Sequence, residues 1–341
     1  MSHLAAAFLN KRLGLIIMPT EKCNYRCVYC YEDFEQGRMA DSVSDGIVRL
    51  VASRAPLLDQ LTISWFGGEP LLAMAVIEKI MQAANDSAAE HAIRLHSGAT
   101  TNGHLLTLPR LRRLCALGVS QYQITIDGPA DVHNARRRQA KGAGDLATIL
   151  ANLHAACASD LLFAITLRIH LDEISVPRFD DLLAELGTIV QDPRVSFAFE
   201  MLGNYGRALP DTIRPMSRGR FQDAARMLED RLAGLGKAAS GADADEEHVC
   251  YAATPNSFVI RADGAVQMCT VALNAAHNAV GRIGSDGVIR LNERYAQWLS
   301  GWHMDDRAAL QCPAKAIVAM QAAAKQPRAT ALPHAIERIV A

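Results

Sequence analysis

Short apolar runs alternate with amphipathic stretches along the first two thirds of the chain. The runs have the length of buried strands, and the stretches between them carry apolar residues at helical spacing, as Val43, Ile47 and Val51 do. Strands are predicted at residues 13–19, 61–66, 92–96, 119–126, 162–169 and 195–201, and helices at 41–53, from 70 to about 84, and at 108–117, 145–158, 176–186 and 218–235. Six strands that alternate with six helices predict parallel βαβ units, arranged as a barrel or as a doubly wound sheet.

The pattern changes after residue 235. Residues 236–247 are rich in Gly, Ala and Asp and are typical of a mobile linker. Two short apolar runs then flank Asp263 and Gly264, an arrangement that predicts a β-hairpin. We therefore expect an α/β domain at 1–235, a linker at 236–249 and a smaller C-terminal domain at 250–341.

Composition excludes several classes of protein. The chain has 341 residues, of which 50% are apolar, so it can bury a large core without disulfides. Lys and Arg number 35 and Asp and Glu 36, for a net charge of -1, which favours neither nucleic acid nor an anionic membrane surface. No apolar stretch approaches the roughly 20 residues of a membrane span, and no signal-peptide cleavage site is evident. Eight cysteines without a secretion signal indicate reduced thiols and a cytoplasmic location.

Three cysteines directly follow the first predicted strand. Cys23, Cys27 and Cys30 have Cx3Cx2C spacing and lie on one short loop. Thiolates hold cubane 4Fe–4S clusters, so three of them leave one of the four irons open to another ligand. The alternatives are a zinc knuckle or part of a structural cluster. Zinc takes four ligands in structural sites, and no fourth Cys or His lies near this loop.

Polar and glycine residues stand at the ends of later predicted strands. Gly67 and Gly68 let backbone approach a ligand closely, and the Glu69 carboxylate can receive an ammonium group, although a tight turn before a helix explains the same residues. The Asn102-Gly103 and Asp127-Gly128-Pro129 segments are also common turns. In parallel α/β folds, ligands bind at this end of the sheet.

Together these motifs resemble those of the radical S-adenosylmethionine (SAM) superfamily. The resemblance implies a partial (βα)6 TIM-like barrel with a 4Fe–4S cluster whose open iron chelates the amine and carboxylate of SAM. It implies that Gly67, Gly68 and Glu69 bind the amino group of SAM. The cofactor-binding residues predicted in full are Tyr29 beside adenine, Gly67, Gly68, Glu69, Asn102, Thr125 and Arg168.

Two of these positions carry further detail. Thr125 corresponds to the hydroxyl residue that reaches the SAM ribose or carboxylate in peptide-modifying members. Arg168 faces a barrel interior if its strand alternates, where the SAM carboxylate or a structural ion pair is its partner. His133, Arg137 and the later Gly144 resemble the H-D-x-x-R motif of the same enzymes, with Asn134 in place of the acidic residue.

A second cysteine set lies in the C-terminal region. Cys250, Gly264 and Cys269 match the opening of the SPASM domain, which carries auxiliary Fe–S clusters in peptide maturases, and Cys312 follows. The full SPASM cysteine pattern is absent, because Lys315 stands where the next cysteine is expected and none occurs after Cys312. Three thiolates hold at most one auxiliary cluster, and His248 and His303 are candidates for its fourth ligand.

The resemblance implies an enzyme that cleaves SAM to a 5′-deoxyadenosyl radical and abstracts hydrogen from a ribosomally made peptide, installing a cross-link or similar change. The expected partners are the precursor peptide, a flavodoxin- or ferredoxin-like electron donor and a separate leader-recognition protein, since the cysteine loop begins only about twenty residues into the chain. No catalytic acid or base is assigned. The first alternative is an anaerobic sulfatase maturase, although Thr270 stands where those enzymes have an acidic residue. The second is a non-enzymatic Fe–S or metal-binding protein.

Overall fold

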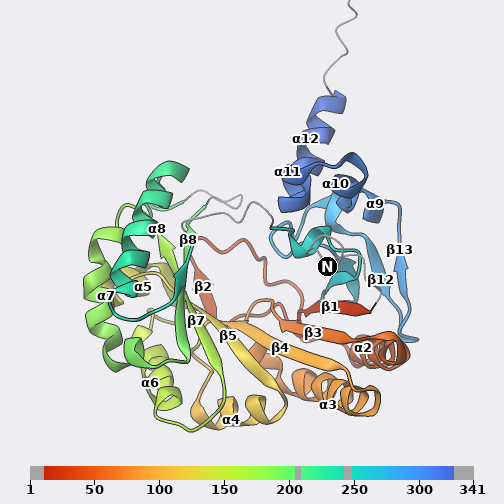
Figure 1. Ribbon diagram of the computed structural model, residues 1–341, viewed down its shortest axis with the longest axis horizontal. Helices are drawn as coiled ribbons and strands as arrows, with labels where there is room; N and C mark the ends of the chain where they lie inside the picture. Colours follow the sequence, from red (N-terminus) through yellow and green to blue (C-terminus); the bar gives the residue numbers. More distant parts are fainter. Residues whose placement is uncertain (1–10, 204–208, 242–247, 326–341) are drawn as a thin grey trace, which may run out of the picture.

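The computed structural model describes residues 11–203, 209–241 and 248–325. Within these residues eleven strands form one sheet, in the order β13-β12-β11-β10-β1-β3-β4-β5-β7-β8-β9 (Figure 1). Its strands are β1 (Arg12–Ile17), β3 (Gln60–Trp65), β4 (Arg94–Thr101), β5 (Val119–Ile126), β7 (Ala164–Leu171), β8 (Val195–Met201), β9 (Ala239–Ser240), β10 (Ser257–Ile260), β11 (Ala265–Gln267), β12 (Gly281–Ile283) and β13 (Ile289–Leu291). A separate two-stranded sheet joins β2 (Tyr25–Cys27) to β6 (Arg137–Gln139).

The centre of the sheet is a partial barrel. Strands β1, β3, β4, β5, β7 and β8 pair in parallel, and Figure 1 shows them bent into an open arc with helices along the outer side. The helices are α2 (Asp41–Arg54), α3 (Met74–His91), α4 (Leu108–Ala116), α5 (Ala130–Arg136), α6 (Leu146–Cys157), α7 (Phe179–Leu186), α8 (Arg218–Ala233), α9 (Arg294–Trp298), α10 (Ser300–Met304), α11 (Arg307–Gln311) and α12 (Pro313–Lys325). The predicted alternation of strands and helices is confirmed, and of the two architectures it allowed, the structure adopts the barrel.

Side-chain alternation along the strands separates the two faces of the arc. In β7, Ile165, Leu167 and Ile169 are buried in the core under the helices, whereas Arg168 and His170 alternate with them. Successive side chains of a strand point to opposite faces, so Arg168 and His170 lie on the concave side. The chain thus keeps its apolar residues between sheet and helices and leaves polar residues inside the arc.

Most element boundaries lie within two residues of the predicted ones, and the clear exceptions are α3 and β4, which continues to Thr101 past the predicted end at residue 96. β5 and β8 span the predicted residues, whereas α3 continues to His91, past the predicted end near residue 84. Ala92, with φ of 55°, closes the helix in the left-handed conformation. The polar and Ala-rich segment before it contains no Gly or Pro that would stop a helix, so the strand begins at Arg94 and not at residue 92.

The C-terminal region continues the same sheet. β10 pairs in parallel with β1, and the predicted hairpin of β10 and β11 is confirmed. The sheet therefore runs across the expected boundary between domains, and the division itself remains a prediction. Residues 242–247 of the expected linker lie outside the described residues, as do the chain ends at 1–10 and 326–341. In the described part of the chain, no helix has both the length and the apolar character needed to cross a bilayer.

Candidate active site

The cysteine loop is held over the concave side of the barrel by backbone pairing. Its strand β2 pairs antiparallel with β6, which places Cys27 opposite Arg137. The Val28 N–H also donates to the Arg136 carbonyl oxygen at 2.9 Å. Because β6 directly follows α5, the turn after β5 and the cysteine loop are fixed against each other.

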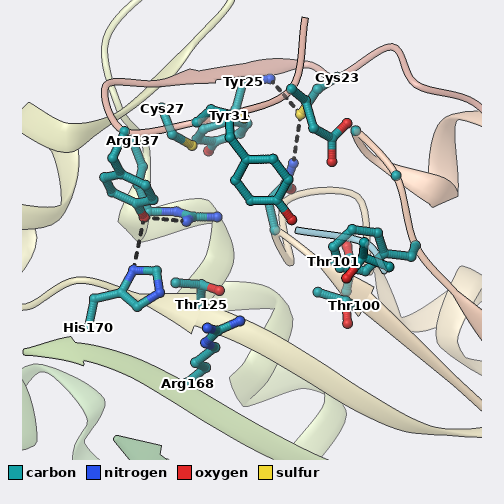
Figure 2. Close-up of a pocket in the computed structure, with 18 of the residues that line it drawn as sticks. Cys23, Tyr25, Cys27, Tyr31, Thr100, Thr101, Thr125, Arg137, Arg168 and His170 are labelled. Carbon is teal, nitrogen blue, oxygen red and sulfur yellow. Dashed lines mark hydrogen bonds between the residues drawn. The ribbon is translucent and has the colours of Figure 1, made fainter. Parts of the chain in front are cut away.

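One pocket receives the loop and the ends of five barrel strands (Figure 2). All three thiols of the loop line it, together with residues that follow β3, residues at the end of β4, one residue of β5, two residues of β7 and Leu202 directly after β8. The polar, glycine and cysteine residues in its wall include Cys23, Cys27, Tyr29, Cys30, Gly67, Gly68, Thr100, Thr101, Asn102, Thr125, Arg137, Arg168, His170 and Thr270. Six of the seven predicted cofactor-binding residues are therefore brought together, and Glu69 is the exception.

Glu69 lies behind the pocket wall. Its side chain is 0% exposed, and its carboxylate accepts hydrogen bonds from the Thr101 hydroxyl at 2.8 Å and from the backbone N–H groups of Asn102 at 2.8 Å and Leu71 at 3.1 Å. The carboxylate thus joins the end of β3 to the end of β4 and caps the turn that follows it. Its geometry supports a bracing role for Glu69 and leaves the pocket wall to Gly67 and Gly68.

Gly67 and Gly68 allow the cysteine loop to lie close to the backbone that follows β3. A Cβ atom at Gly68 would lie 2.5 Å from the Lys22 carbonyl oxygen and 2.6 Å from that of Glu21. Gly67 has a φ of 110°, a backbone conformation that residues with a side chain rarely adopt. A Cβ atom there would also clash with the Thr20 carbonyl oxygen. The sequence predicted close approach of a ligand at these glycines, and the structure places the backbone of the cysteine loop there.

The thiols fit a cluster held by three cysteines. Burial raises the pKa of Cys23 to about 12 and that of Cys30 to about 11, so both thiols are protonated until iron displaces the protons. The Cys23 sulfur faces N–H donors, namely the Tyr25 backbone at 3.3 Å and the Asn102 amide at 3.9 Å. Such donors tune the reduction potential of a bound cluster. No group of three or more His, Cys, Asp or Glu side chains within the described residues is arranged around a single metal ion.

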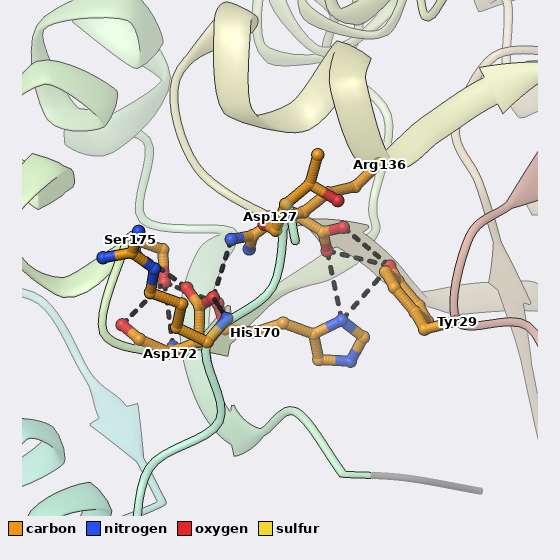
Figure 3. Close-up of polar contacts among 8 residues, drawn as sticks. Tyr29, Asp127, Arg136, His170, Asp172 and Ser175 are labelled. Atoms are coloured by element: carbon orange, nitrogen blue, oxygen red, sulfur yellow. Dashed lines mark hydrogen bonds and ion pairs between the residues drawn. The ribbon is translucent and has the colours of Figure 1, made fainter. Parts of the chain in front are cut away.

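A buried polar network borders the pocket on the β5 and β7 side (Figure 3). The Tyr29 hydroxyl donates to the Asp127 carboxylate at 2.8 Å and accepts from the Arg137 guanidinium at 2.7 Å. His170 Nδ1 lies 3.1 Å from Asp127 Oδ1 and 3.2 Å from the Tyr29 oxygen. Tyr29 therefore presents its ring to the pocket while its hydroxyl joins the cysteine loop to β5, β6 and β7.

The remaining predicted residues differ in their surroundings. Asn102 donates from its side chain to Asn24 Oδ1 at 2.8 Å, which ties the end of β4 to the cysteine loop. Arg168 lies 3.5 Å from Glu200 across the concave face, and its buried Nε has no hydrogen-bond partner within the described structure. That orphan donor, aimed from the pocket wall, fits an anionic ligand group. Thr125 is buried at the end of β5 and lines the pocket.

Several pocket residues were absent from the predicted set, and four of them are instructive. His170 follows Arg168 by two positions, so the same strand alternation would have placed it on the pocket face. Arg137 was noted only as part of a motif. Thr270 and Val271 come from the C-terminal region and could not be placed from sequence, because their approach depends on how β10 and β11 extend the sheet.

The C-terminal cysteines also come close to one another. The pKa of Cys250 is raised, mainly by burial and also by the nearby thiols of Cys269 and Cys312. A hydrogen bond from the Ala252 backbone partly opposes this rise. Cys312 and His248 line a common cavity beside α11 and α12, whereas His303 is not part of its wall. The Cys250 N–H donates to the Leu310 carbonyl oxygen at 3.0 Å, which fixes this loop to α11.

Comparison with known proteins identifies the class of the chain. Residues 17–183 match the profile of the family described as the radical SAM superfamily. The chain therefore contains a radical SAM domain. The family uses a 4Fe–4S cluster and SAM, which are the cofactors of this domain.

Two curated relatives share part of this chain. It is 24% identical to the PqqA peptide cyclase of Gluconobacter oxydans (strain 621H) over 64% of this chain and 57% of that protein. It is 31% identical to the GTP 3′,8-cyclase of Synechococcus sp. (strain CC9605) over 39% of each chain. In both cases the match spans less than two thirds of the relative.

Solved structures extend the likeness to the whole fold. A structure titled native anSMEcpe with bound AdoMet and Cp18Cys peptide has a TM-score of 0.63 at 17% identity, over 80% of this chain and 77% of that one. Streptococcus suis SuiB bound to precursor peptide SuiA has a TM-score of 0.58 at 12% identity, over 91% of this chain and 69% of that one. The radical SAM partial barrel predicted from the sequence is thus confirmed as the fold.

Proposed function

We propose that this protein is a radical SAM enzyme that modifies a ribosomally made peptide. The observation that carries the proposal is one pocket that combines three loop thiols, the ends of five barrel strands and the residues after Cys269. When bound and reduced, the cluster with SAM supplies a 5′-deoxyadenosyl radical that abstracts hydrogen from a substrate carbon. Cys23, Cys27 and Cys30 hold the cluster, and the rest of the pocket orients SAM and excludes water.

Different residues of the pocket wall have different roles in binding SAM. The backbone at Gly67 and Gly68 forms the wall beside the cysteine loop, while Arg137 and Arg168 offer cationic groups to the carboxylate of SAM. Arg137 is 7% exposed and already bound to Tyr29, so it is fixed before a ligand arrives. Such preorganised donors stabilise a bound anion without reorganisation of the site.

A peptide is the substrate class that the C-terminal region supports best. Thr270 and Val271 reach the pocket from the segment that carries Cys269, so the SPASM-like part of the chain completes the site. The relatives named as a peptide cyclase and as SuiB with its precursor peptide support the same class. The GTP 3′,8-cyclase relative acts on a nucleotide by its name, so a test must include substrates of both kinds.

The sulfatase-maturase alternative is supported by the likeness to anSMEcpe. In those enzymes an acidic base is expected directly after the second auxiliary cysteine. Here that position is Thr270, whose hydroxyl lies 2.8 Å from the Tyr251 hydroxyl and whose side chain lines the pocket. A neutral residue there removes the expected base, so we favour a cross-link or similar change over formylglycine formation.

We further propose one auxiliary cluster held by Cys250, Cys269 and Cys312, with His248 as a candidate fourth ligand. The electrostatic coupling of the three thiols and the cavity shared by Cys312 and His248 support it. Iron analysis after anaerobic reconstitution is expected to give about eight irons per chain with this cluster and about four without it. Replacing Cys250, Cys269 and Cys312 together by Ala should then leave about four.

The reaction itself is tested by incubating the reconstituted protein with SAM and a reductant such as flavodoxin. The expected product is 5′-deoxyadenosine, and the Cys23→Ala, Cys27→Ala, Cys30→Ala triple variant should form none. Absence of product from the fully loaded protein would overturn the radical-enzyme hypothesis. Mass spectrometry of a short peptide encoded beside the gene, co-expressed with the enzyme, is expected to show a loss of two mass units for a cross-link.

A further inference from the structure

His170 is the least explained polar residue of the pocket. Its side chain is 12% exposed and forms part of the pocket wall, as Figure 2 shows. Its Nδ1 atom lies within hydrogen-bond distance of both Asp127 and Tyr29, whereas no partner is found for Nε2 within the described structure. The proton on the imidazole ring therefore decides what His170 offers to a ligand.

The hydrogen bonds around Asp127 determine which ring nitrogen of His170 carries the proton. Burial opposes ionisation of the Asp127 carboxyl, but the hydrogen bond from His170 and the charge of Arg137 outweigh it and lower the pKa. Tyr29 donates its hydroxyl proton to the same carboxylate. A carboxylate only accepts, so His170 Nδ1 must carry hydrogen and donate to Asp127. Burial lowers the pKa of His170, so the ring is neutral and Nε2 keeps a lone pair.

That lone pair is an acceptor on the β7 side of the pocket, where Arg137 and Arg168 are donors. The Glu32 carboxyl also lines the pocket, and burial raises its pKa to about 8. The groups that face His170 are Asp127 directly after β5, Tyr29 on the cysteine loop, Arg137 on β6 and Arg168 on its own strand. Asp127 is fully buried and already has its partners. An O–H or N–H donor of a bound ligand that approaches from the pocket would therefore find His170 Nε2 as its acceptor.

SAM brings few such donors once its methionine amine and carboxylate are bound at the cluster. Its remaining donors are two ribose hydroxyls and the amino group of adenine, and its only O–H donors are the hydroxyls. We infer that His170 Nε2 accepts a hydrogen bond from a ribose hydroxyl of SAM, with Asp127 holding the ring in the required tautomer. This inference rests on the proposed function, since it needs SAM in this pocket.

Two substitutions at His170 separate the acceptor from the structural contact. His170→Asn keeps an amide N–H at the position of Nδ1 and can still donate to Asp127, but it has no atom at the position of Nε2. His170→Gln reaches the position of Nε2 with a carbonyl oxygen and gives up the Asp127 contact. If the acceptor matters, His170→Asn should weaken binding of S-adenosylhomocysteine about tenfold, and His170→Gln should weaken it less.

The readout is equilibrium dialysis of S-adenosylhomocysteine against the anaerobically reconstituted protein, and its 2′-deoxy and 3′-deoxy forms identify the hydroxyl. One deoxy form should lose about tenfold in affinity for the unchanged protein and less than twofold for His170→Asn. Equal losses in both proteins, or unchanged binding by His170→Asn, would overturn the inference. Normal binding together with lost peptide modification would assign His170 to a substrate hydroxyl and also overturn it.

Failure of the proposed function has a different signature. In that case the unchanged protein, with its iron content complete, would neither bind SAM nor release 5′-deoxyadenosine. The inference about His170 can also fail while the proposed function holds. In that case the unchanged protein binds SAM, but removal of a ribose hydroxyl lowers its affinity by the same factor as it lowers that of His170→Asn. Dialysis together with the SAM-cleavage assay therefore distinguishes the two results.

Discussion

At the scale of single residues, the site depends on ionisable groups held in one protonation state by burial. His133 is 0% exposed, and its Nδ1 accepts the Asp127 N–H at 3.4 Å. Burial and the nearby Arg137 charge lower its pKa to about 3. A charged imidazole here would face a buried guanidinium, so the native protein keeps His133 neutral.

This depressed pKa makes the stability pH-dependent. In the unfolded chain His133 has a pKa near 6.5, so below that pH it is protonated in the unfolded state but stays neutral in the folded state. From pH 7.5 to 5.5 we expect His133 to lower the free energy of unfolding by about 1.4 kcal/mol. Urea unfolding of the chain and of His133→Asn measures this, and equal pH slopes for the two proteins would contradict it.

Gly68 is a residue whose missing side chain positions the cysteines. A Cβ there would press on the Lys22 and Glu21 carbonyl oxygens, and backbone atoms cannot swing away as side chains do. We expect Gly68→Ala to displace the cysteine loop and to lower iron content after reconstitution several-fold. Gly219→Ala in α8 is the matched control, because a Cβ added there would have no neighbouring atom within 4 Å, and iron content should be unchanged. Full iron loading of Gly68→Ala would show that the loop tolerates the shift.

At the scale of elements, a buried ion pair fixes the segment that precedes α8. Arg136 of α5 and Asp172 after β7 are both 0% exposed and 2.7 Å apart. Arg136 Nε also donates to the Thr212 carbonyl oxygen at 2.9 Å, and the Arg214 N–H donates to Asp172 at 2.8 Å. Figure 3 shows that Ser175 connects this pair to the backbone of His170, so the pair stands directly behind the proposed SAM contact.

Removing one charge of this ion pair should lower the free energy of unfolding more than removing both charges. Asp172→Leu alone leaves the Arg136 charge buried without its counter-ion, and Arg136→Met alone does the same to the Asp172 charge. For each single variant we expect a loss of about 3–5 kcal/mol in the free energy of unfolding. The Arg136→Met, Asp172→Leu double variant has no buried charge and should lose less than either single variant. Urea unfolding of the three variants forms a double-mutant cycle, and additive losses would mean that the pair contributes no coupling.

The elements also show what the sequence could predict. Strands 119–126 and 195–201 are long enough for their apolar patterns to define them, and the prediction is confirmed. β2 and β6 have three residues each, too few for a period, so the pairing that places Cys27 opposite Arg137 has no local signal. Residues such as Thr125 could be placed because they lie at the end of a predicted strand. Thr270 instead depends on pairing between β1 and β10, strands that lie far apart in the sequence.

At the scale of the whole molecule, the continuous sheet makes the C-terminal region part of the barrel. β1 is bonded to β3 on one side and to β10 on the other, with Gly14 to Ile17 in register with Ser257 to Ile260. Arg261, which follows β10, pairs with the buried Glu21 of the cysteine loop, their Nε and Oε1 atoms 2.9 Å apart. The C-terminal region thus reaches both the edge of the barrel and the loop that holds the cluster.

This continuity predicts that the expected N-terminal domain does not fold alone. A fragment of residues 1–249 would leave the edge of β1 unpaired and would expose Leu15 and Ile17, which are 1% and 0% exposed in the native chain. An exposed apolar edge strand favours aggregation, so we expect this fragment to be insoluble or aggregated. Fragment 1–325, which keeps all the described strands, should behave as the full chain does in size-exclusion chromatography and thermal unfolding. If the 1–249 fragment were monomeric and unfolded cooperatively, the barrel would be an independent domain and β10 an accessory strand.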